Sequence, residues 1–249
     1  MIDTHCHLDS CKPPDEELVD RARAVGVRRI ATVGMDDASI GRAVATANAH
    51  EEVVAIVGRH PNASQGFESQ DIEPIERAVA DSRVRAIGET GLDYYRDYAP
   101  REDQLRAFES QVALAKRHGL PLVIHTRAAE EDTFAVLRDQ ADGLTVIMHC
   151  FSAPGRLAEC VERGWLCSFA GNVTYPKAAE LQDAAREVPD ELLLVETDAP
   201  YLSPQPVRGK PNEPANVART AEYVAELRGV RYADLEAAVE RNAARVFGW

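Results

Sequence analysis

The chain has 249 residues, of which 45% are hydrophobic and 28% are charged, and its formal net charge is −13. This length and composition fit one globular domain with a large core, and the acidic charge excludes broad, nonspecific binding to a phosphate backbone. No apolar run reaches the roughly 18 residues that a membrane-spanning helix needs, which excludes a membrane protein of that kind.

The first residues, Met1–Thr4, have the pattern of a strand, which leaves no room for a signal peptide. The five cysteines form no C-x-x-C pair, as expected of free thiols in a reducing compartment. We therefore expect a cytoplasmic protein, and no sequence feature indicates an obligate protein partner.

Eight short apolar runs follow one another along the chain and predict strands buried on both faces. They are Met1–Thr4, Arg28–Val33, Val53–Val57, Val84–Gly88, Leu120–Ile124, Leu144–Met148, Trp165–Phe169 and Leu192–Val195.

Segments with helical periodicity lie between many of these runs. They begin near Glu16 and continue with Arg101–Arg117, Glu130–Asp139, Gly155–Arg163, Ala178–Glu187, Asn216–Leu227 and about Ala233–Val246. Alternating strands and helices predict a parallel sheet, and eight units in this length fit a single (β/α)₈ (TIM) barrel domain over residues 1–249. An open doubly wound sheet is the alternative, although no G-x-G-x-x-G follows the first strand.

Histidines and carboxylates gather where the predicted strands end. They are His5, His7, His60, Glu89, His125, His149, Glu196 and Asp198. In a (β/α)₈ barrel the carboxyl ends of the strands meet at one mouth, where active sites are built. We therefore expect these side chains to surround one site.

Two of the histidines form an H-x-H pair on the first strand. Residues i and i+2 of a strand face the same way, so His5 and His7 can bind one metal ion. Glu89 follows an apolar run that we expect to be buried. Burying a carboxylate without a cation or a partner costs much free energy, so Glu89 is best explained as a ligand that bridges two ions. His125 and His149 each follow apolar residues at a strand end in the same way.

The last strand ends in Glu196-Thr197-Asp198. By the same alternation we expect Glu196 and Asp198 to share a face. Asp198 is assigned to the metal and to the attacking water as the base, and Glu196 to orienting a ligand from one layer deeper. The reverse assignment of these two carboxylates is left open.

The predicted metal ligands are His5, His7, Glu89, His125, His149 and Asp198. Nitrogen and oxygen ligands without thiolate suit Mg²⁺, Mn²⁺ or Zn²⁺. Two ions sharing Glu89 would lie about 4 Å apart, activate a water and clamp the attacking and leaving oxygens, which is hydrolytic chemistry.

The motifs around these residues resemble the TatD family of metal-dependent hydrolases, within the amidohydrolase superfamily. The matching segments are DTHCHLD (3–9), GETGLDY (88–94), PLVIHTR (121–127), HCFS (149–152), ETDAPYL (196–202) and RGKPNEP (208–214). The resemblance covers essentially the whole chain. It implies a deoxyribonuclease that removes nucleotides by phosphodiester hydrolysis, typically with Mg²⁺. It also implies that His5, His7 and Asp198 hold one ion and His125 and His149 the other, with Glu89 bridging as a second catalytic residue.

Four further residues are candidates for binding substrate. His60 can donate to a phosphate oxygen, and Arg127, Arg208 and Lys210 supply positive charge in an acidic chain. For each there is a structural alternative: a cap held by Pro61 for His60, an ion pair for Arg127, and a solvated loop for the other two. We expect Asp93 to contact a metal ligand, and not the metal or the substrate, and so to hold that ligand in place.

The leading interpretation is a two-metal phosphodiesterase that acts on nucleic acid, DNA in particular. An amide or ester hydrolase, such as an aminoacyl-tRNA deacylase, would use the same site. A metal-binding protein without turnover is disfavoured by the complete ligand set.

Overall fold

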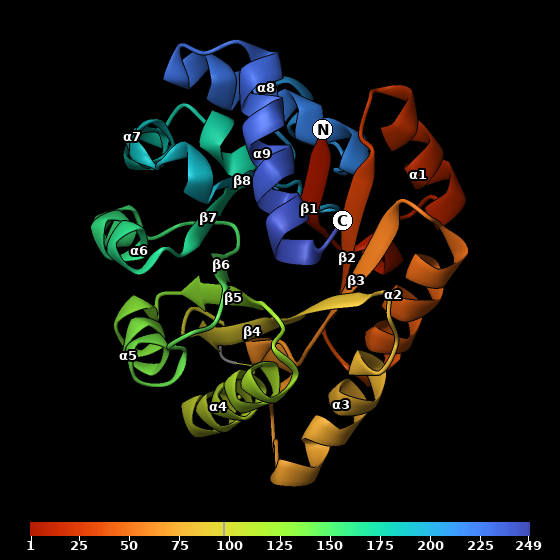
Figure 1. Ribbon diagram of the computed structural model, residues 1–249, viewed down its shortest axis with the longest axis vertical. Coiled ribbons are helices and arrows are strands. Elements are labelled where there is room, and N and C mark those ends of the chain that lie inside the picture. Colours follow the sequence, from red (N-terminus) through yellow and green to blue (C-terminus); the bar gives the residue numbers. More distant parts are fainter. Residues whose placement is uncertain (97) are drawn as a thin grey trace.

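The computed structural model describes residues 1–96 and 98–249 as a barrel of parallel strands with helices around it (Figure 1). The strands are β1 (Ile2–Cys6), β2 (Arg29–Gly34), β3 (Val53–Val57), β4 (Val84–Asp93), β5 (Leu122–Arg127), β6 (Val146–Met148), β7 (Leu166–Phe169) and β8 (Leu193–Val195). Each strand pairs with the next in chain order. The predicted (β/α)₈ barrel is confirmed, and this strand order excludes the doubly wound alternative.

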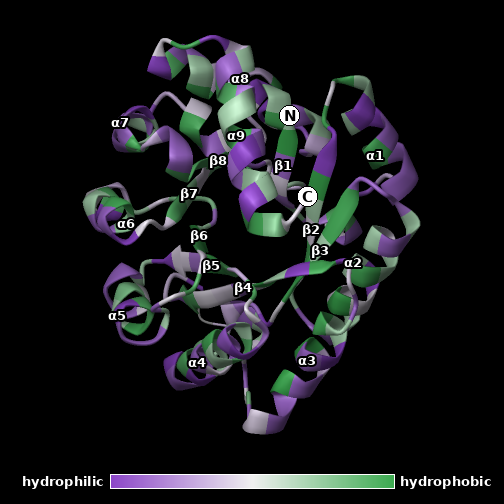
Figure 2. Ribbon diagram, in the orientation of Figure 1, coloured by the Kyte–Doolittle hydropathy of each residue, from purple (hydrophilic) through white to green (hydrophobic). Residues whose placement is uncertain are grey.

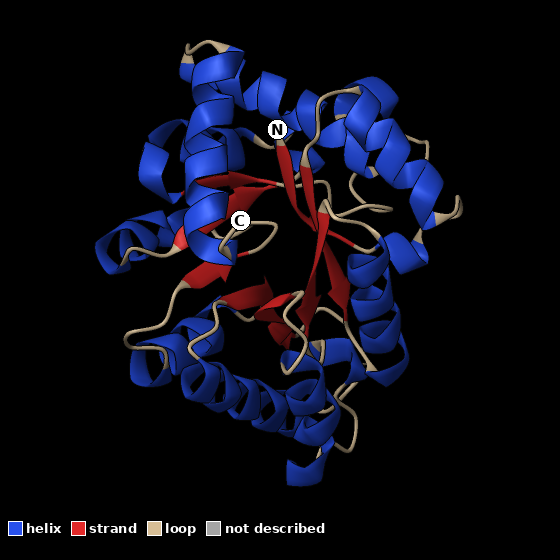
Figure 3. Ribbon diagram, turned by 45° about the vertical axis from the view of Figure 1, so that its right-hand side comes forward, coloured by secondary structure: helices blue, strands red, loops and turns tan. Residues whose placement is uncertain are grey.

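The helices between the strands form the outer layer, which Figure 3 shows around the strands. They are α1 (Asp15–Ala24), α2 (Asp37–Ala49), α3 (Glu73–Val79), α4 (Arg101–His118), α5 (Glu130–Gln140), α6 (Leu157–Arg163), α7 (Ala179–Glu187), α8 (Val217–Arg228) and α9 (Tyr232–Phe247). Within the described residues, none of these helices combines the length and apolar character needed to cross a bilayer.

Helices α2 and α3 are not apparent from the periodicity of the sequence. A signal for α2 was available, because Asp36 accepts from the Ser39 backbone N–H at 2.7 Å and Ser39 Oγ accepts from the Asp36 N–H at 2.9 Å. This reciprocal cap marks a helix start. The seven residues of α3 are too few to show a clear repeat.

Loop residues close the barrel between β8 and β1. The Asp198 N–H donates to the His5 carbonyl at 2.9 Å, and the His7 N–H donates to the Ala199 carbonyl at 2.7 Å. Beneath them, the buried Asp3 carboxylate accepts from the Thr197 N–H at 2.9 Å. The segment after β8 therefore completes the ring and is held against the H-x-H pair.

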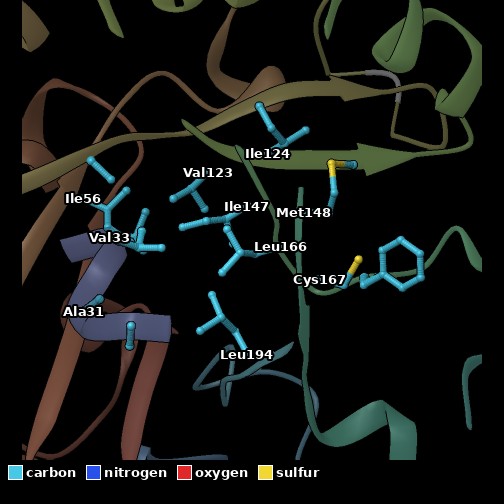
Figure 4. Packing of buried hydrophobic residues seen from close by; sticks show 14 of the residues in the cluster. Ala31, Val33, Ile56, Val123, Ile124, Ile147, Met148, Leu166, Cys167 and Leu194 are labelled. Carbon is cyan, nitrogen blue, oxygen red and sulfur yellow. The ribbon is translucent and has the colours of Figure 1, made fainter. Parts of the chain in front are cut away.

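Apolar side chains fill the barrel interior, and the strands are mostly hydrophobic where the outer helix faces are polar (Figure 2). Figure 4 shows Val123, Ile147 and Leu194 directed into the space that the strands enclose. Each lies two residues before a residue of the predicted site. Since side chains alternate along a strand, the same alternation that packs the core directs His125 and His149 into the mouth.

Strand β4 continues five residues beyond the predicted end at Gly88, because Gly91 lets it run close to β5. Gly91 has φ +135° and pairs with His125, and a Cβ built on it would lie 2.0 Å from the His125 carbonyl oxygen. Glycine at this position therefore sets the distance between Glu89 on β4 and His125 on β5.

We expect Gly91→Ala to lower the free energy of unfolding by about 2–5 kcal/mol, because it adds both a strained φ and a backbone clash. Denaturant unfolding measures the change. Gly143→Ala is the matched control, since Gly143 has φ +77° and nothing within 4 Å of the added Cβ. Equal losses in the two variants would show that the close approach of β4 and β5 contributes nothing.

Candidate metal centre

The side chains predicted to bind metal converge at the carboxyl ends of the strands, around the buried carboxylate of Glu89. Its two oxygens face different groups. Oε2 lies 3.4 Å from His5 Nε2 and 3.7 Å from His7 Nε2. Oε1 lies 2.6 Å from His125 Nδ1 and 3.3 Å from His149 Nε2. Glu89 is therefore placed between two clusters of possible ligand atoms.

The first cluster comes from both ends of the chain. The Nε2 atoms of His5 and His7 are 3.3 Å apart, and Asp198 Oδ1 lies 3.3 Å from His7 Nε2 and 4.0 Å from His5 Nε2. Ligands about 2.1 Å from one ion lie roughly 3–3.5 Å from each other. The separations within this cluster are close to that range.

The second cluster contains His60 as well as His125 and His149. His60 Nε2 lies 3.4 Å from Glu89 Oε1, as close as His149 does. The sequence predicts His60 at the mouth, and its place beside the predicted bridging carboxylate is a finding of the structure. The available signal was the His60-Pro61 turn, where His60 Nδ1 accepts from the Asn62 N–H at 3.0 Å and so directs Nε2 inward.

Carboxylates also lie beside the ring nitrogens of His149 and His125 that point away from Glu89. His149 Nδ1 lies 2.8 Å from Glu196 Oε1, and His125 Nε2 lies 3.4 Å from Asp93 Oδ2. When a metal ion is bound beside Glu89, the carboxylate on the far side of each ring would favour a proton on the nitrogen that it faces, and the other nitrogen would be free to bind the metal. His60 differs, because its Nδ1 is an acceptor and its Nε2 therefore carries the proton. His60 is thus arranged as a donor and not as a metal ligand.

The alternation expected of Glu196 and Asp198 does not apply to them, because β8 ends at Val195 and Asp198 has φ +55°. The two carboxylates instead reach different partners. Glu196 is fully buried, and its Oε1 accepts from the Cys150 N–H at 2.8 Å besides contacting His149. Asp198 keeps 13% of its side chain exposed beside His7. It therefore contacts both the first cluster and solvent.

Asp3 is a buried polar residue that the sequence analysis did not select. Its carboxylate accepts from Thr197 Oγ1 at 2.6 Å, and burial raises its pKa to about 8. The available signal was its position two residues before His5 on the same face of β1. It joins β1 to the turn that carries Asp198.

Of the four residues predicted to bind substrate, Arg127, Arg208 and Lys210 lie farther out. The Arg127 guanidinium lies over the Tyr95 ring at 4.0 Å, and that of Arg208 lies over the Tyr175 ring at 4.3 Å. Lys210 is exposed in the loop of Arg208. The structure thus brings His60 to the centre and leaves the other three at the rim of the mouth.

The electrostatics of the centre favour a bound cation. Burial would raise the pKa of Glu89, but the charge of His149 and the hydrogen bond from His125 hold it well below its usual value. Burial would likewise raise the pKa of Asp198, yet His7 lowers it. Burial would lower the pKa of His149, whereas Glu196 and Glu89 raise it well above its usual value. Positive charge is therefore stabilised between these carboxylates.

Protons alone are a poor source of that charge. The rings of His5 and His149 are stacked with centroids 3.6 Å apart, and burial followed by the charge of His149 lowers the pKa of His5. A divalent cation balances the carboxylates while the rings stay neutral. The donor set of imidazole and carboxylate groups without thiolate fits Mg²⁺, Mn²⁺ or Zn²⁺.

Comparisons with known proteins give a consistent result. The family model described as TatD related DNase matches residues 2–248. The chain is 41% identical to the uncharacterized metal-dependent hydrolase TatD of Mycobacterium tuberculosis, covering 100% of this chain and 98% of the relative. It is 31% identical to the 3'-5' ssDNA/RNA exonuclease TatD of Klebsiella pneumoniae, covering 94% and 91%. The crystal structure of YjjV, a TatD homologue from Escherichia coli, superposes with a TM-score of 0.93 at 30% identity, covering 100% and 98%.

Proposed function

This chain belongs to the TatD family of metal-dependent hydrolases, and on that premise we propose that it is an exonuclease-like phosphodiesterase acting on DNA. The observation that carries the proposal is the position of Glu89, whose two oxygens face separate clusters of histidine and carboxylate atoms. A carboxylate between two ligand clusters could hold two ions about 4 Å apart, as in the two-metal sites of nucleases and phosphatases. The relative named an ssDNA/RNA exonuclease supports the same bond type.

In this proposal His5, His7, Asp198 and Glu89 would hold one ion, while His125, His149 and Glu89 would hold the other. The bound ions would lower the pKa of water and neutralise charge on the phosphate. Glu196 and Asp93 hold the rings of His149 and His125 in the orientation and protonation state that metal binding needs.

Two residues of the chain act on the reacting groups. Asp198, ionised and 13% exposed, accepts the proton of the attacking water. His60 donates from Nε2 to a phosphate oxygen, because burial lowers its pKa and keeps the ring neutral with Nδ1 as the acceptor. Arg127, Arg208 and Lys210 hold the nucleic acid farther out.

We expect chelation to abolish hydrolysis, and Mg²⁺, Mn²⁺ or Zn²⁺ to restore it with two ions bound per chain. Each ion that binds only the folded state also stabilises it, by about 2.7 kcal/mol at a concentration of 100 Kd. Metal analysis after dialysis measures the stoichiometry, and thermal unfolding with and without ions measures the stabilisation. A stoichiometry of one ion in a fully active protein would contradict the bridging role of Glu89.

The substrate class is tested by assaying the chelated and then metal-reloaded protein on single-stranded DNA, RNA, aminoacyl-tRNA and simple amides. We expect cleavage of DNA from an end, with release of nucleotides. Hydrolysis of aminoacyl-tRNA or amides without any cleavage of phosphodiesters would replace the proposal with an ester or amide hydrolase that uses the same centre.

A further inference from the structure

We propose that two arginine–tyrosine pairs at the rim of the mouth, Tyr95 with Arg127 and Tyr175 with Arg208, bind single-stranded nucleic acid by stacking on its unpaired bases. In the first pair Tyr95 follows β4 and Arg127 is the last residue of β5, and the second pair lies on the loops that follow β7 and β8. The proposal rests on the function proposed above and assigns the residues that select an unpaired strand.

The exposed tyrosines of the described chain all lie at this face of the barrel. The side chains of Tyr95, Tyr98 and Tyr201 are 65%, 59% and 53% exposed, on the loops that follow β4 and β8. Large aromatic side chains left in water around a site are typical of binding surfaces. Tyr201 also lies beside the centre, with its ring centroid 6.0 Å from that of His7.

The arginines of the two pairs differ from most others on this acidic surface. Arg42 and Arg117, for example, contact Asp9 and Glu76 at 2.8 and 3.1 Å. Within residues 1–96 and 98–249, by contrast, Arg127 and Arg208 have no carboxylate within 4 Å and lie over tyrosine rings instead. A guanidinium stacked on a ring keeps its N–H donors at its edge, where a phosphate can accept them.

Both pairs are anchored to the loops that build the centre. Asp93 Oδ1 accepts from the Tyr95 N–H at 3.0 Å, and its other oxygen lies beside His125. On the other side, Tyr175 Oη donates to the Ser203 carbonyl at 3.0 Å, which ties its ring to the loop that carries Arg208. The backbone of Tyr95 and the ring of Tyr175 are therefore tied to the loops of the centre before any substrate binds, which lowers the entropy cost of binding.

Tyrosine rings, together with guanidinium groups that contact no carboxylate among the described residues, match one kind of occupant. Aromatic rings stack on bases of any sequence, and arginines contact the phosphates between them. A base within a duplex already has both faces covered by its neighbours, so it cannot use the rings. The occupant is therefore a single strand of nucleic acid with unpaired bases, and its end would lie near Glu89.

The test measures binding, which does not depend on turnover. The dissociation constants of a phosphorothioate oligothymidylate and of the same strand with abasic sugars are measured for each variant. Tyr95→Ala should weaken binding of the base-bearing strand by about 5- to 100-fold and that of the abasic strand by less than 2-fold. Tyr95→Phe, which keeps the ring, should bind as the wild type does.

Arg127→Gln should weaken binding of both strands and reduce the dependence of affinity on salt, because it removes a phosphate contact. The matched control is Arg241→Gln on α9, whose neighbours Glu240 and Ala244 line a cavity with Ile2 and Arg29 at the opposite end of the barrel. The control should bind both strands normally.

Equal losses on base-bearing and abasic strands in Tyr95→Ala, or no loss on either, would overturn the proposal. So would an equal loss on a duplex with no free end. The metal-loaded wild type could bind the strand in this base-dependent way and still cleave no phosphodiester. That result would support base stacking at the rim and contradict the proposed hydrolysis, so the two proposals can fail separately.

Discussion

Glu89→Gln should reduce turnover by roughly 10³-fold or more, because each metal ion contributes several kcal/mol to stabilising the transition state and this residue contacts both clusters. The amide keeps one oxygen but turns an N–H₂ donor toward either His5 or His125, where a lone-pair donor is needed. The variant should also bind fewer than two ions.

Steady-state hydrolysis and metal analysis on the same preparation measure both effects. The control is Glu76→Gln, a surface carboxylate of α3 that pairs with Arg117. It should change neither the rate nor the metal content. A Glu89→Gln protein that keeps two ions and near-normal turnover would show that the ions are held without a bridging carboxylate.

Asp198→Asn should reduce turnover by about 10²- to 10⁴-fold, the contribution of a general base. Asparagine keeps the shape and one oxygen beside His7 but removes the charge and the basicity. Since Asp198 has no contact with the second cluster among the described residues, at least one ion should remain bound by Glu89, His125 and His149.

Glu196→Gln is the comparison. Its carboxylate contacts His149 Nδ1 and the Cys150 N–H from beneath the centre, so its loss should cost about 10- to 100-fold, chiefly through weaker metal binding. Steady-state rates at saturating metal separate the two residues. If Asp198→Asn retained turnover while Glu196→Gln lost it, Glu196 would be the base and Asp198 the supporting residue.

The barrel and the location of its site could be predicted from the sequence because both follow from short-range patterns. Continuous apolar runs such as Val53–Val57 indicate strands buried on both faces. Parallel strands bring their carboxyl ends together, so His5, Glu89 and His149 had to lie near one another once the strands closed into a ring. Alternation within a strand also explains why His125 lies above Val123.

The roles of individual atoms depended on contacts between distant segments. Asp198 lies beyond the last strand, in a turn held by its hydrogen bond to His5 and by Asp3 through Thr197, so alternation along β8 did not apply to it. Nor does the chain order show that Asp93 faces His125. These contacts join residues far apart in sequence, and no local pattern encodes them.

The sequence by itself determined where the strands fall along the chain and which residue types stand at their ends. It could do so because the periodicity of apolar residues is a local property. Only the tertiary structure decided which nitrogen of each histidine faces Glu89, that His60 lies beside it, and that Arg127 stacks on Tyr95. Side-chain orientation depends on the partners that other loops supply, and those partners meet only when the barrel has closed.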